Sequence, residues 1–368
     1  MMPKMSLYKC LLQISAFMHL CTPVRTAPTV GGSDLHGVES DLGLYEGELQ
    51  PRAVQARWPL VGVNQCGLEY GDKHIPGQVG TDYFIPEMSS INQFFNLGHN
   101  IIRVPFLMER LLNHDRIDGN FHNVGYLREI GHLVDQITNQ GKFAVIVPLN
   151  YGRFGGNIIK DLNGFGDFWR SLAGKFAKND KVIFDIMNEW HDEPMRLVHD
   201  LLHHAIVGIR ASGASSQAIW IEGACWDNAW AWNQCKGTDG ISHDILANLK
   251  DPSNKLVYSI HVYMDQDDTG HWLDDCDGKE PLVGINHLRP PTAWLRKHKK
   301  VGVIGEFGAR PTPNCLKATK IALNYLKKNG GLWQGVLWWN SGSHTKDQPS
   351  SIEPGTKGFD MYAKLLAS

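Results

Sequence analysis

The chain has 368 residues, of which 36 are lysine or arginine and 38 are aspartate or glutamate. This near balance of charges gives no electrostatic reason to expect a nucleic acid partner. The sequence has no apolar run long enough to cross a bilayer, so we expect no membrane-spanning segment. Apolar residues make up 42% of the chain, enough for a large buried core, and the length suits two average domains or one large barrel.

The N-terminus has the pattern of a secretory signal peptide. Lys4 and Lys9 give it a positively charged start, residues 10–20 are mainly apolar, and small residues follow near Ala27. We therefore expect residues 1–27 to be a signal peptide and the mature protein to be secreted and extracellular.

The next segment, residues 28–57, is rich in glycine and acidic residues and shows little periodicity. This composition predicts a flexible acidic leader. From residue 58 onward the sequence changes to short apolar runs that alternate with longer amphipathic segments. We expect the folded domain to occupy residues 58–368.

Five cysteines remain after the signal peptide, an odd number that leaves at least one thiol unpaired. In an oxidising compartment Cys225 with Cys235 would close a short tryptophan-rich loop, and Cys276 with Cys315 would tie two longer loops together. Cys66 would then stay free in its apolar surroundings. No cysteine or histidine spacing is typical of a zinc site, so we expect no metal.

Eight apolar runs alternate with amphipathic segments along the folded domain. The apolar runs are 61–66, 100–106, 143–149, 182–188, 218–223, 255–263, 301–307 and 335–340. The segments expected to be helical are 87–98, 124–140, 165–178, 193–211, 283–299, 314–329 and 357–366. This alternation indicates parallel strands buried on both faces, and eight repeats predict a single closed (β/α)8 TIM barrel. The glycine-rich turns of nucleotide-binding sheets are missing.

Polar and aromatic residues lie at the ends of several apolar runs, where the active site of such a barrel forms. Arg103 ends the second run, Asn188 and Glu189 the fourth, His261 and Tyr263 the sixth, Glu306 the seventh and Trp339 the eighth. Such residues at successive strand ends predict a shared polar pocket.

Glu189 and Glu306 suit the cleavage of a glycosidic bond. One carboxyl group must be protonated to assist the leaving oxygen, and the other must be ionised to attack the anomeric carbon. Arg103 and the Tyr263 hydroxyl could keep Glu306 ionised. A separation near 5 Å would imply retention of configuration through a covalent intermediate.

The remaining pocket residues have both functional and structural interpretations. Asn188 is placed to hold a sugar hydroxyl, and Trp339 could form the floor under the reacting sugar. Alternatively, the two glutamates could belong to a structural salt bridge and Arg103 to a buried ion pair, while His261, Tyr263 and Trp339 could be core residues.

Five segments together resemble glycoside hydrolase family 5, and most closely its fungal-type endo-β-1,4-glucanases. They are RVP at 103–105, IMNEWHD at 186–192, SIHVYMDQDDTG at 259–270, VIGEFG at 303–308 and WWNSGS at 338–343. The resemblance extends from about residue 60 to residue 345. It implies a catalytic domain over 58–368.

The resemblance implies roles for the pocket residues. Glu189 would be the acid/base and Glu306 the nucleophile. The residues around the reacting sugar would be Arg103, Asn188, His261, Tyr263 and Trp339. Trp226 would stack on a sugar, whereas Trp230 and Trp232 could form a substrate platform or pack within their loop.

Two positions depart from the family pattern. Trp190 follows the acid/base glutamate where the family usually has proline. Leu149, in LNY at 149–151, stands where the family usually has a histidine that lines the reacting subsite. Leucine removes a hydrogen bond there, which Asn150 could partly replace.

We therefore expect retaining, endo-acting hydrolysis of β-1,4-glucan by a monomer without cofactor. Another β-linked polysaccharide, such as mannan, xyloglucan or mixed-linkage glucan, is an alternative substrate. Because of Leu149, a carbohydrate-binding pseudoenzyme is a further alternative.

Overall fold

The computed structural model describes residues 59–368, except 113–114, 266–267, 271–274 and 277–281. The expected signal peptide (1–27), the whole expected leader (28–57) and residue 58, where we expected the domain to begin, lie outside the described residues. Among the helices described, none combines the length and the apolar character that crossing a bilayer requires.

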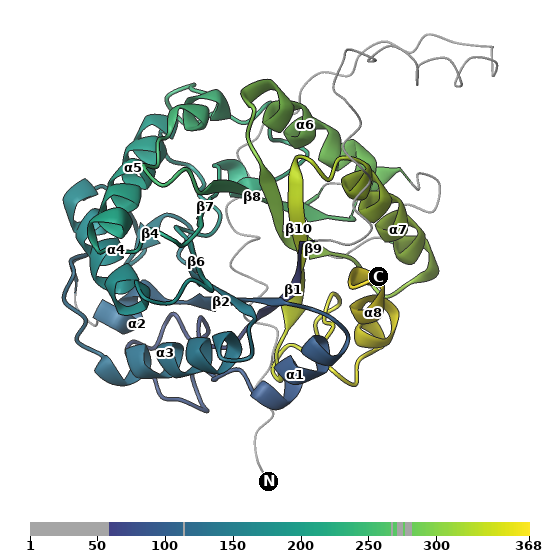
Figure 1. The fold of residues 1–368 in the computed structure, drawn as a ribbon, viewed down its shortest axis with the longest axis horizontal. Coiled ribbons are helices and arrows are strands. Elements are labelled where there is room, and N and C mark those ends of the chain that lie inside the picture. The colour runs from purple at the N-terminus through teal and green to yellow at the C-terminus, as the bar shows by residue number, and fades with distance from the viewer. Residues whose placement is uncertain (1–58, 113–114, 266–267, 271–274, 277–281) are drawn as a thin grey trace. The chain divides into compact units, whose positions relative to one another are not determined.

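Eight parallel strands close into a barrel with helices around it, as Figure 1 shows. They are β1 Leu60–Gln65, β2 Ile101–Phe106, β3 Phe143–Pro148, β6 Val182–Asp185, β7 Ile219–Ile221, β8 Leu256–Tyr263, β9 Gly302–Gly308 and β10 Trp333–Ser341. Their order around the barrel is β1-β10-β9-β8-β7-β6-β3-β2. All eight predicted strands are present, and the predicted (β/α)8 barrel is confirmed.

The predicted helices are also present. They are α1 Met88–Asn96, α3 Val124–Thr138, α4 Leu162–Phe176, α5 Met195–Ala211, α6 Val283–His298, α7 Pro313–Lys328, and at the C-terminus η4 Phe359–Ala363 followed by α8 Lys364–Leu366. Short elements were not predicted, because they span too few residues to show a periodic pattern. These are α2 Met108–Leu112, the hairpin of β4 Arg153–Phe154 and β5 Asn157–Ile158, η2 Cys225–Asp227 and η3 His243–Asn248.

An apolar layer fills the barrel beneath the polar pocket. One inward residue from each of seven strands forms it: Ile101, Val145, Ile183, Trp220, Val257, Val303 and Leu337. Side chains two positions apart on a strand share a face. Continuing two residues along β2, β6, β7 and β10 gives Arg103, Asp185, Glu222 and Trp339. The alternation thus places a polar layer directly above the apolar one.

Candidate active site

Arg103 is the centre of the polar layer. It is fully buried, and it lies inside β2 rather than at the end of the strand as predicted. Its Nε donates to Asp185 at 2.9 Å, its Nη1 to Glu306 and Asn64 at 2.8 Å each, and its Nη2 to Asn188 at 2.8 Å and Glu222 at 2.9 Å. A planar fork of five donors suits this arrangement, because each acceptor meets a fixed N–H direction. Arg103 therefore links four strands and the loop after β6.

Glu306 lies within β9 and is 2% exposed. Its Oε1 accepts from Arg103 Nη1, and its Oε2 accepts from the Tyr263 hydroxyl. A cation and a hydroxyl donor on the two oxygens stabilise a carboxylate charge. Arg103 and Tyr263 thus both contact Glu306, as a role in keeping it ionised requires.

Glu189 follows β6 in a loop and has a left-handed backbone with φ of 49°. Its amide N–H donates to Glu222 Oε2 at 2.7 Å, and its Oε1 lies 2.8 Å from His261 Nδ1. Burial raises the pKa of Glu189 to about 7, although the hydrogen bond from His261 opposes this rise. A left-handed non-glycine residue is strained and needs support from its surroundings.

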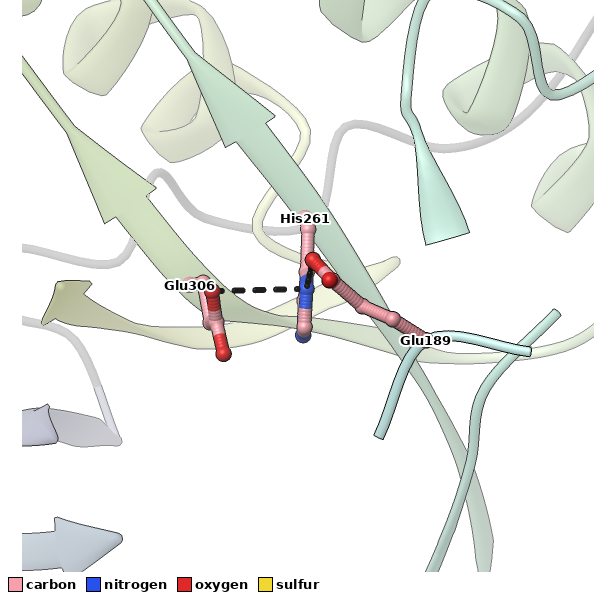
Figure 2. Close-up of side chains that lie close together, drawn as sticks. All are labelled: Glu189, His261 and Glu306. Carbon is pink, nitrogen blue, oxygen red and sulfur yellow. Dashed lines mark hydrogen bonds and ion pairs between the residues drawn. The ribbon is translucent and has the colours of Figure 1, made fainter. Parts of the chain in front are cut away.

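His261 lies between the two glutamates, as Figure 2 shows. Its Nδ1 is 2.8 Å from Glu189 Oε1 and 3.5 Å from Glu306 Oε2. One oxygen of each glutamate and a ring nitrogen all lie within 4.8 Å of one another. Burial disfavours a charged His261, but Glu306 and Glu222 outweigh it and hold the pKa of the imidazole well above its usual value. The two glutamates therefore favour the charged form of the ring that lies between them.

The described pocket holds more buried acids than bases. Asp185, Glu222 and Asp227 are fully buried beside Arg103 and His261. Burial raises the pKa of Asp185 and that of Asp227 well above the usual range. Five carboxyl groups share two cations in this pocket, so burial disfavours the ionised forms of these two acids.

Among the residues that the structure describes, two sets of ligand-type atoms are close enough to hold a metal ion: Glu189, His261 and Glu306, and Glu222, Asp227 and His261. His261 belongs to both sets and already pairs with carboxylates in each. The imidazole of His261 thus already occupies the centre of both sets and joins them through ion pairs.

Trp226 lies beside this network and is 42% exposed. Its ring stacks on His191 with a centroid distance of 3.6 Å and an interplanar angle of 10°, and Tyr151 lies 5.7 Å away. Cys225, Trp226 and Asp227 have consecutive left-handed backbones, with φ between 52° and 61°. The exposed face of Trp226 is available for stacking on a sugar ring.

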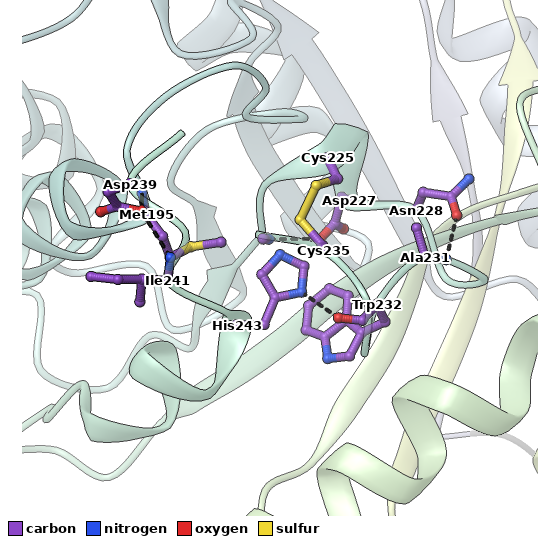
Figure 3. Close-up of a disulfide and its surroundings, with 11 residues drawn as sticks. Met195, Cys225, Asp227, Asn228, Ala231, Trp232, Cys235, Asp239, Ile241 and His243 are labelled. Carbon is purple, nitrogen blue, oxygen red and sulfur yellow. Dashed lines mark hydrogen bonds between the residues drawn. A yellow bond between two sulfur atoms is a disulfide. The ribbon is translucent and has the colours of Figure 1, made fainter. Parts of the chain in front are cut away.

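Figure 3 shows the disulfide between Cys225 and Cys235. It closes the loop to which Trp226 belongs. Asp227 Oδ1 accepts from the Gly223 amide at 2.6 Å, which closes the turn from the other side. The predicted Cys225–Cys235 and Cys276–Cys315 disulfides are both present, and Cys66 is a buried free thiol. The cysteine predictions are therefore confirmed.

The other tryptophans near the site differ in how much of their side chain is exposed. Trp230 is 49% exposed, whereas Trp232 is fully buried within the same loop. Trp339 is half-buried and lies on β10 two residues after the inward-facing Leu337. Its neighbour Trp338 packs in the core against Tyr362. Alternation along the strand therefore directs Trp339 toward the pocket.

Leu149 follows β3 and lies four residues after the inward-facing Val145, so the strand's alternation directs both side chains to the inside of the barrel. Asn150 does not replace the missing histidine, contrary to our expectation. Its Oδ1 accepts from the Met108 amide at 3.0 Å, and its Nδ2 donates to Glu109 at 2.6 Å. Both ends of the Asn150 amide therefore fasten the loop to α2, and the pocket wall at Leu149 is apolar.

Trp190 is buried beneath the loop after β3. Gly152 has φ of 73°, and a Cβ atom there would lie 2.7 Å from the Trp190 ring and 2.5 Å from Glu193. Glycine is thus required for this close approach. Trp190 supports the loop from below.

Sequence reasoning missed Asp185, Glu222 and Asp227. The first two interrupt the apolar runs VIFDIMN and AIWIEG, and each lies two residues after an apolar layer residue. This two-residue spacing from an inward-facing residue could have predicted that Asp185 and Glu222 face the pocket. Asp227 gave no comparable signal, because its position depends on the turn that the disulfide closes.

The family model described as Cellulase (glycosyl hydrolase family 5) matches residues 62–344. Endoglucanase gh5-1 of Neurospora crassa is 39% identical over 94% of this chain and 86% of its own length. Endo-beta-1,4-glucanase B of Emericella nidulans is 40% identical over 85% of this chain and 91% of its own.

Solved structures of similar proteins agree with this match. An endo-beta-1,4-glucanase from Xanthomonas axonopodis pv. citri is 31% identical, with a TM-score of 0.75 over 81% of this chain and 94% of that one. XacCel5A in complex with cellopentaose is 30% identical, with a TM-score of 0.74 over 82% and 95%. The chain belongs to glycosyl hydrolase family 5, the cellulase family, and is a glycoside hydrolase.

Proposed function

We propose that this protein is a retaining endo-β-1,4-glucanase in which Glu306 is the nucleophile and Glu189 the acid/base. The observation that carries the proposal is the unequal environment of two close carboxyl groups. Glu306 accepts hydrogen bonds from Arg103 and Tyr263, whereas Glu189 is partly buried, and the loss of solvent raises its pKa to about 7. One group is equipped to stay ionised and the other to deliver a proton near neutral pH.

The spacing of Glu189 and Glu306 supports the retaining mechanism. One oxygen of each lies within 4.8 Å of the other. Retaining enzymes place their carboxyl groups about 5–5.5 Å apart, and inverting enzymes need about 6.5–9.5 Å to admit a water molecule. Direct attack by Glu306 is therefore favoured over attack by water.

The reaction proceeds in two steps. In the first, a Glu306 oxygen bonds to the anomeric carbon while Glu189 transfers its proton to the departing sugar oxygen. In the second, Glu189, now ionised, takes a proton from water, whose oxygen attacks the same carbon and releases Glu306. The imidazolium of His261, 2.8 Å from Glu189, stabilises the carboxylate that forms between the steps.

The substrate class is proposed from the relatives and the pocket. The relatives above are named endoglucanases, and one solved neighbour holds cellopentaose. Trp226 offers a partly exposed ring for a neighbouring sugar, and Trp339 is directed toward the reacting sugar. Asn188 Oδ1 accepts from Arg103 Nη2, and we assign the Asn188 amide nitrogen as a donor to a sugar hydroxyl.

Location and assembly are also proposals. Two disulfides are typical of a protein that folds in an oxidising compartment, so we propose an extracellular protein. A (β/α)8 barrel buries its core without a partner, so we propose that the monomer is active.

The test measures reducing ends released from soluble β-1,4-glucan by the wild type, Glu306→Gln and Glu189→Gln. We expect turnover in the wild type and a loss of at least about 10⁴-fold in Glu306→Gln. NMR of the first product should show the β-anomer. An α-anomer would contradict retention.

Mannan, xyloglucan and mixed-linkage glucan are the comparison substrates. Faster turnover of one of these would move the substrate assignment away from β-1,4-glucan. Binding of all four polysaccharides without turnover by the folded wild type would contradict the hydrolase proposal and identify a binding protein.

A further inference from the structure

Glu222 lies at the end of β7 and has no exposed surface. Its Oε1 accepts from Arg103 Nη2 at 2.9 Å and lies 3.4 Å from His261 Nε2. Its Oε2 accepts from the Glu189 amide at 2.7 Å. One carboxylate therefore contacts the partners of both proposed catalytic glutamates.

The contact with the Glu189 amide supports a strained backbone. Glu189 has φ of 49°, a conformation that costs a non-glycine residue free energy unless its surroundings hold it. Glu222 holds it through a short hydrogen bond from the amide to an ionised oxygen. Burial opposes the ionisation of Glu222, but His261 and Arg103 outweigh it and lower the pKa of the carboxyl.

We propose that Glu222 is a positioning residue that fixes the acid/base Glu189 and its partner His261 above the nucleophile. This role rests on the proposed function and deepens it. Glu222 does not reach the reacting atoms, because Arg103, His261 and the Glu189 backbone occupy its two oxygens.

The role requires two acceptor oxygens. Glutamine has the same shape, but one oxygen becomes an NH₂ donor. In one orientation that NH₂ group would face the Glu189 amide N–H. In the other it would face Arg103 Nη2 and His261 Nε2, which are also donors. The substitution thus creates a donor facing a donor without a change in volume.

The experiment compares Glu222→Gln with the wild type on aryl β-cellobiosides of increasing leaving-group pKa. A displaced Glu189 matters most when the leaving oxygen needs a proton. We expect kcat/KM to fall about 100-fold for phenols of high pKa and less than about 10-fold for dinitrophenol. The dependence on leaving-group pKa should therefore become steeper.

Two matched variants separate positioning from general damage. Asp185→Asn removes another buried carboxylate from Arg103, but Asp185 has no contact with the Glu189 amide in the described chain, so its loss should be equal for all leaving groups. Asp251→Asn breaks the buried pair with Arg210 outside the pocket and should leave kcat/KM within about 2-fold of the wild type. An equal loss for every phenol in Glu222→Gln would overturn the proposal.

Amide exchange in the wild type tests the same contact without relying on catalysis. The Glu189 amide should exchange slowly, as expected for a hydrogen bond to a buried carboxylate. Exchange as fast as that of an exposed loop amide would overturn the proposal, even if Glu222→Gln does not fold. If the wild type cleaves no aryl cellobioside, the proposed function fails, and the exchange result still decides the role of Glu222.

Discussion

Glu306 and Glu189 carry the same side chain but are held by different parts of the fold. Glu306 is part of β9, where neighbouring strands fix its backbone, and donors from β2 and β8 meet its two oxygens. Glu189 lies in the loop after β6 with a left-handed backbone, and it depends on Glu222 and His261 for support.

One catalytic candidate is thus fixed by a strand, and the other is fixed by side-chain contacts to a loop. Glu306 is part of a barrel strand, so its backbone stays in place as long as the barrel forms. Glu189 needs contacts from β7 and β8, and the adjacent Trp226 turn is closed by a disulfide. We call Glu306 with Arg103 and Tyr263 the strand-held side of the site, and Glu189 with Glu222 and His261 the loop-held side. Variants should affect the two sides differently.

Arg103→Met should have the largest effect, because Arg103 serves both sides. It leaves Asp185, Glu222 and Glu306 without their cation, and breaking such a buried pair costs about 3–5 kcal/mol. Activity should fall by about 10³-fold or more. Urea unfolding and glucan turnover measure the two losses.

The control for this variant lies outside the pocket. Arg210→Met breaks the buried pair with Asp251 and should cost stability with little change in kcat/KM. Equal activity losses in Arg103→Met and Arg210→Met would show that Arg103 acts through stability alone.

Removing the disulfides should distinguish stability from loop geometry. The Cys276–Cys315 bridge spans 39 residues and Cys225–Cys235 spans 10, so chain entropy predicts losses of about 4 and 3 kcal/mol, respectively. Only the Cys225→Ser/Cys235→Ser pair should raise KM, because that loop carries Trp226. Urea unfolding and kinetics without reductant test this order, and a larger KM effect from the other pair would refute it.

Tyr263→Phe should weaken the strand-held side specifically. It removes the hydroxyl that donates to Glu306 Oε2. We expect kcat/KM to fall about 100-fold, since one preorganised donor to the reacting charge is lost. The melting temperature should change little compared with Arg103→Met. Wild-type kcat/KM in Tyr263→Phe would show that Arg103 alone suffices for Glu306.

Buried histidines away from the carboxyl network should titrate in the opposite direction to His261. Burial lowers the pKa of His99 to about 4, so the folded state binds less proton than the unfolded state below pH 6.5. His99 therefore stabilises the fold above pH 6.5 and loses that contribution as the pH falls toward 4, about 2 kcal/mol between pH 7 and pH 5. His99→Gln removes this titration. Its unfolding free energy should therefore fall by about 2 kcal/mol less than that of the wild type between pH 7 and pH 5. Identical pH dependence in both proteins would contradict the assignment.

The alkaline limb of activity should report the loop-held side. Glu189 must be protonated to act as an acid, and burial raises its pKa to about 7. We expect kcat/KM to fall about 10-fold per pH unit above 7. A profile that stays flat to pH 9 would exclude Glu189 as the titrating acid.

Periodicity in the sequence was sufficient to predict the barrel. Each strand that lines it is a short apolar run, because a parallel strand is buried on both faces. The same alternation explains why Arg103 and Trp339 share the pocket with residues far away in the chain. The strand-held side of the site was therefore visible as polar residues within apolar runs.

The loop-held side was visible only in part. Glu189 was found through its motif, but its left-handed backbone and its dependence on Glu222 were not. Asn150 looked like a substitute for the absent histidine, yet the structure uses its amide to fasten the loop to α2. A short polar side chain has many possible partners, and its spacing in the sequence does not choose among them.

The sequence by itself determined the barrel and the family, because each leaves a repeated pattern or a set of motifs, and it placed Glu189 and Glu306 in one pocket. It suggested the two disulfides without determining how the cysteines pair. Only the tertiary structure decided which carboxyl group meets Arg103, that His261 lies between the glutamates and that Glu222 supports Glu189. Those contacts join residues 33 to 203 positions apart. They depend on strand register and on burial, which removes water and makes each pairing of charges matter.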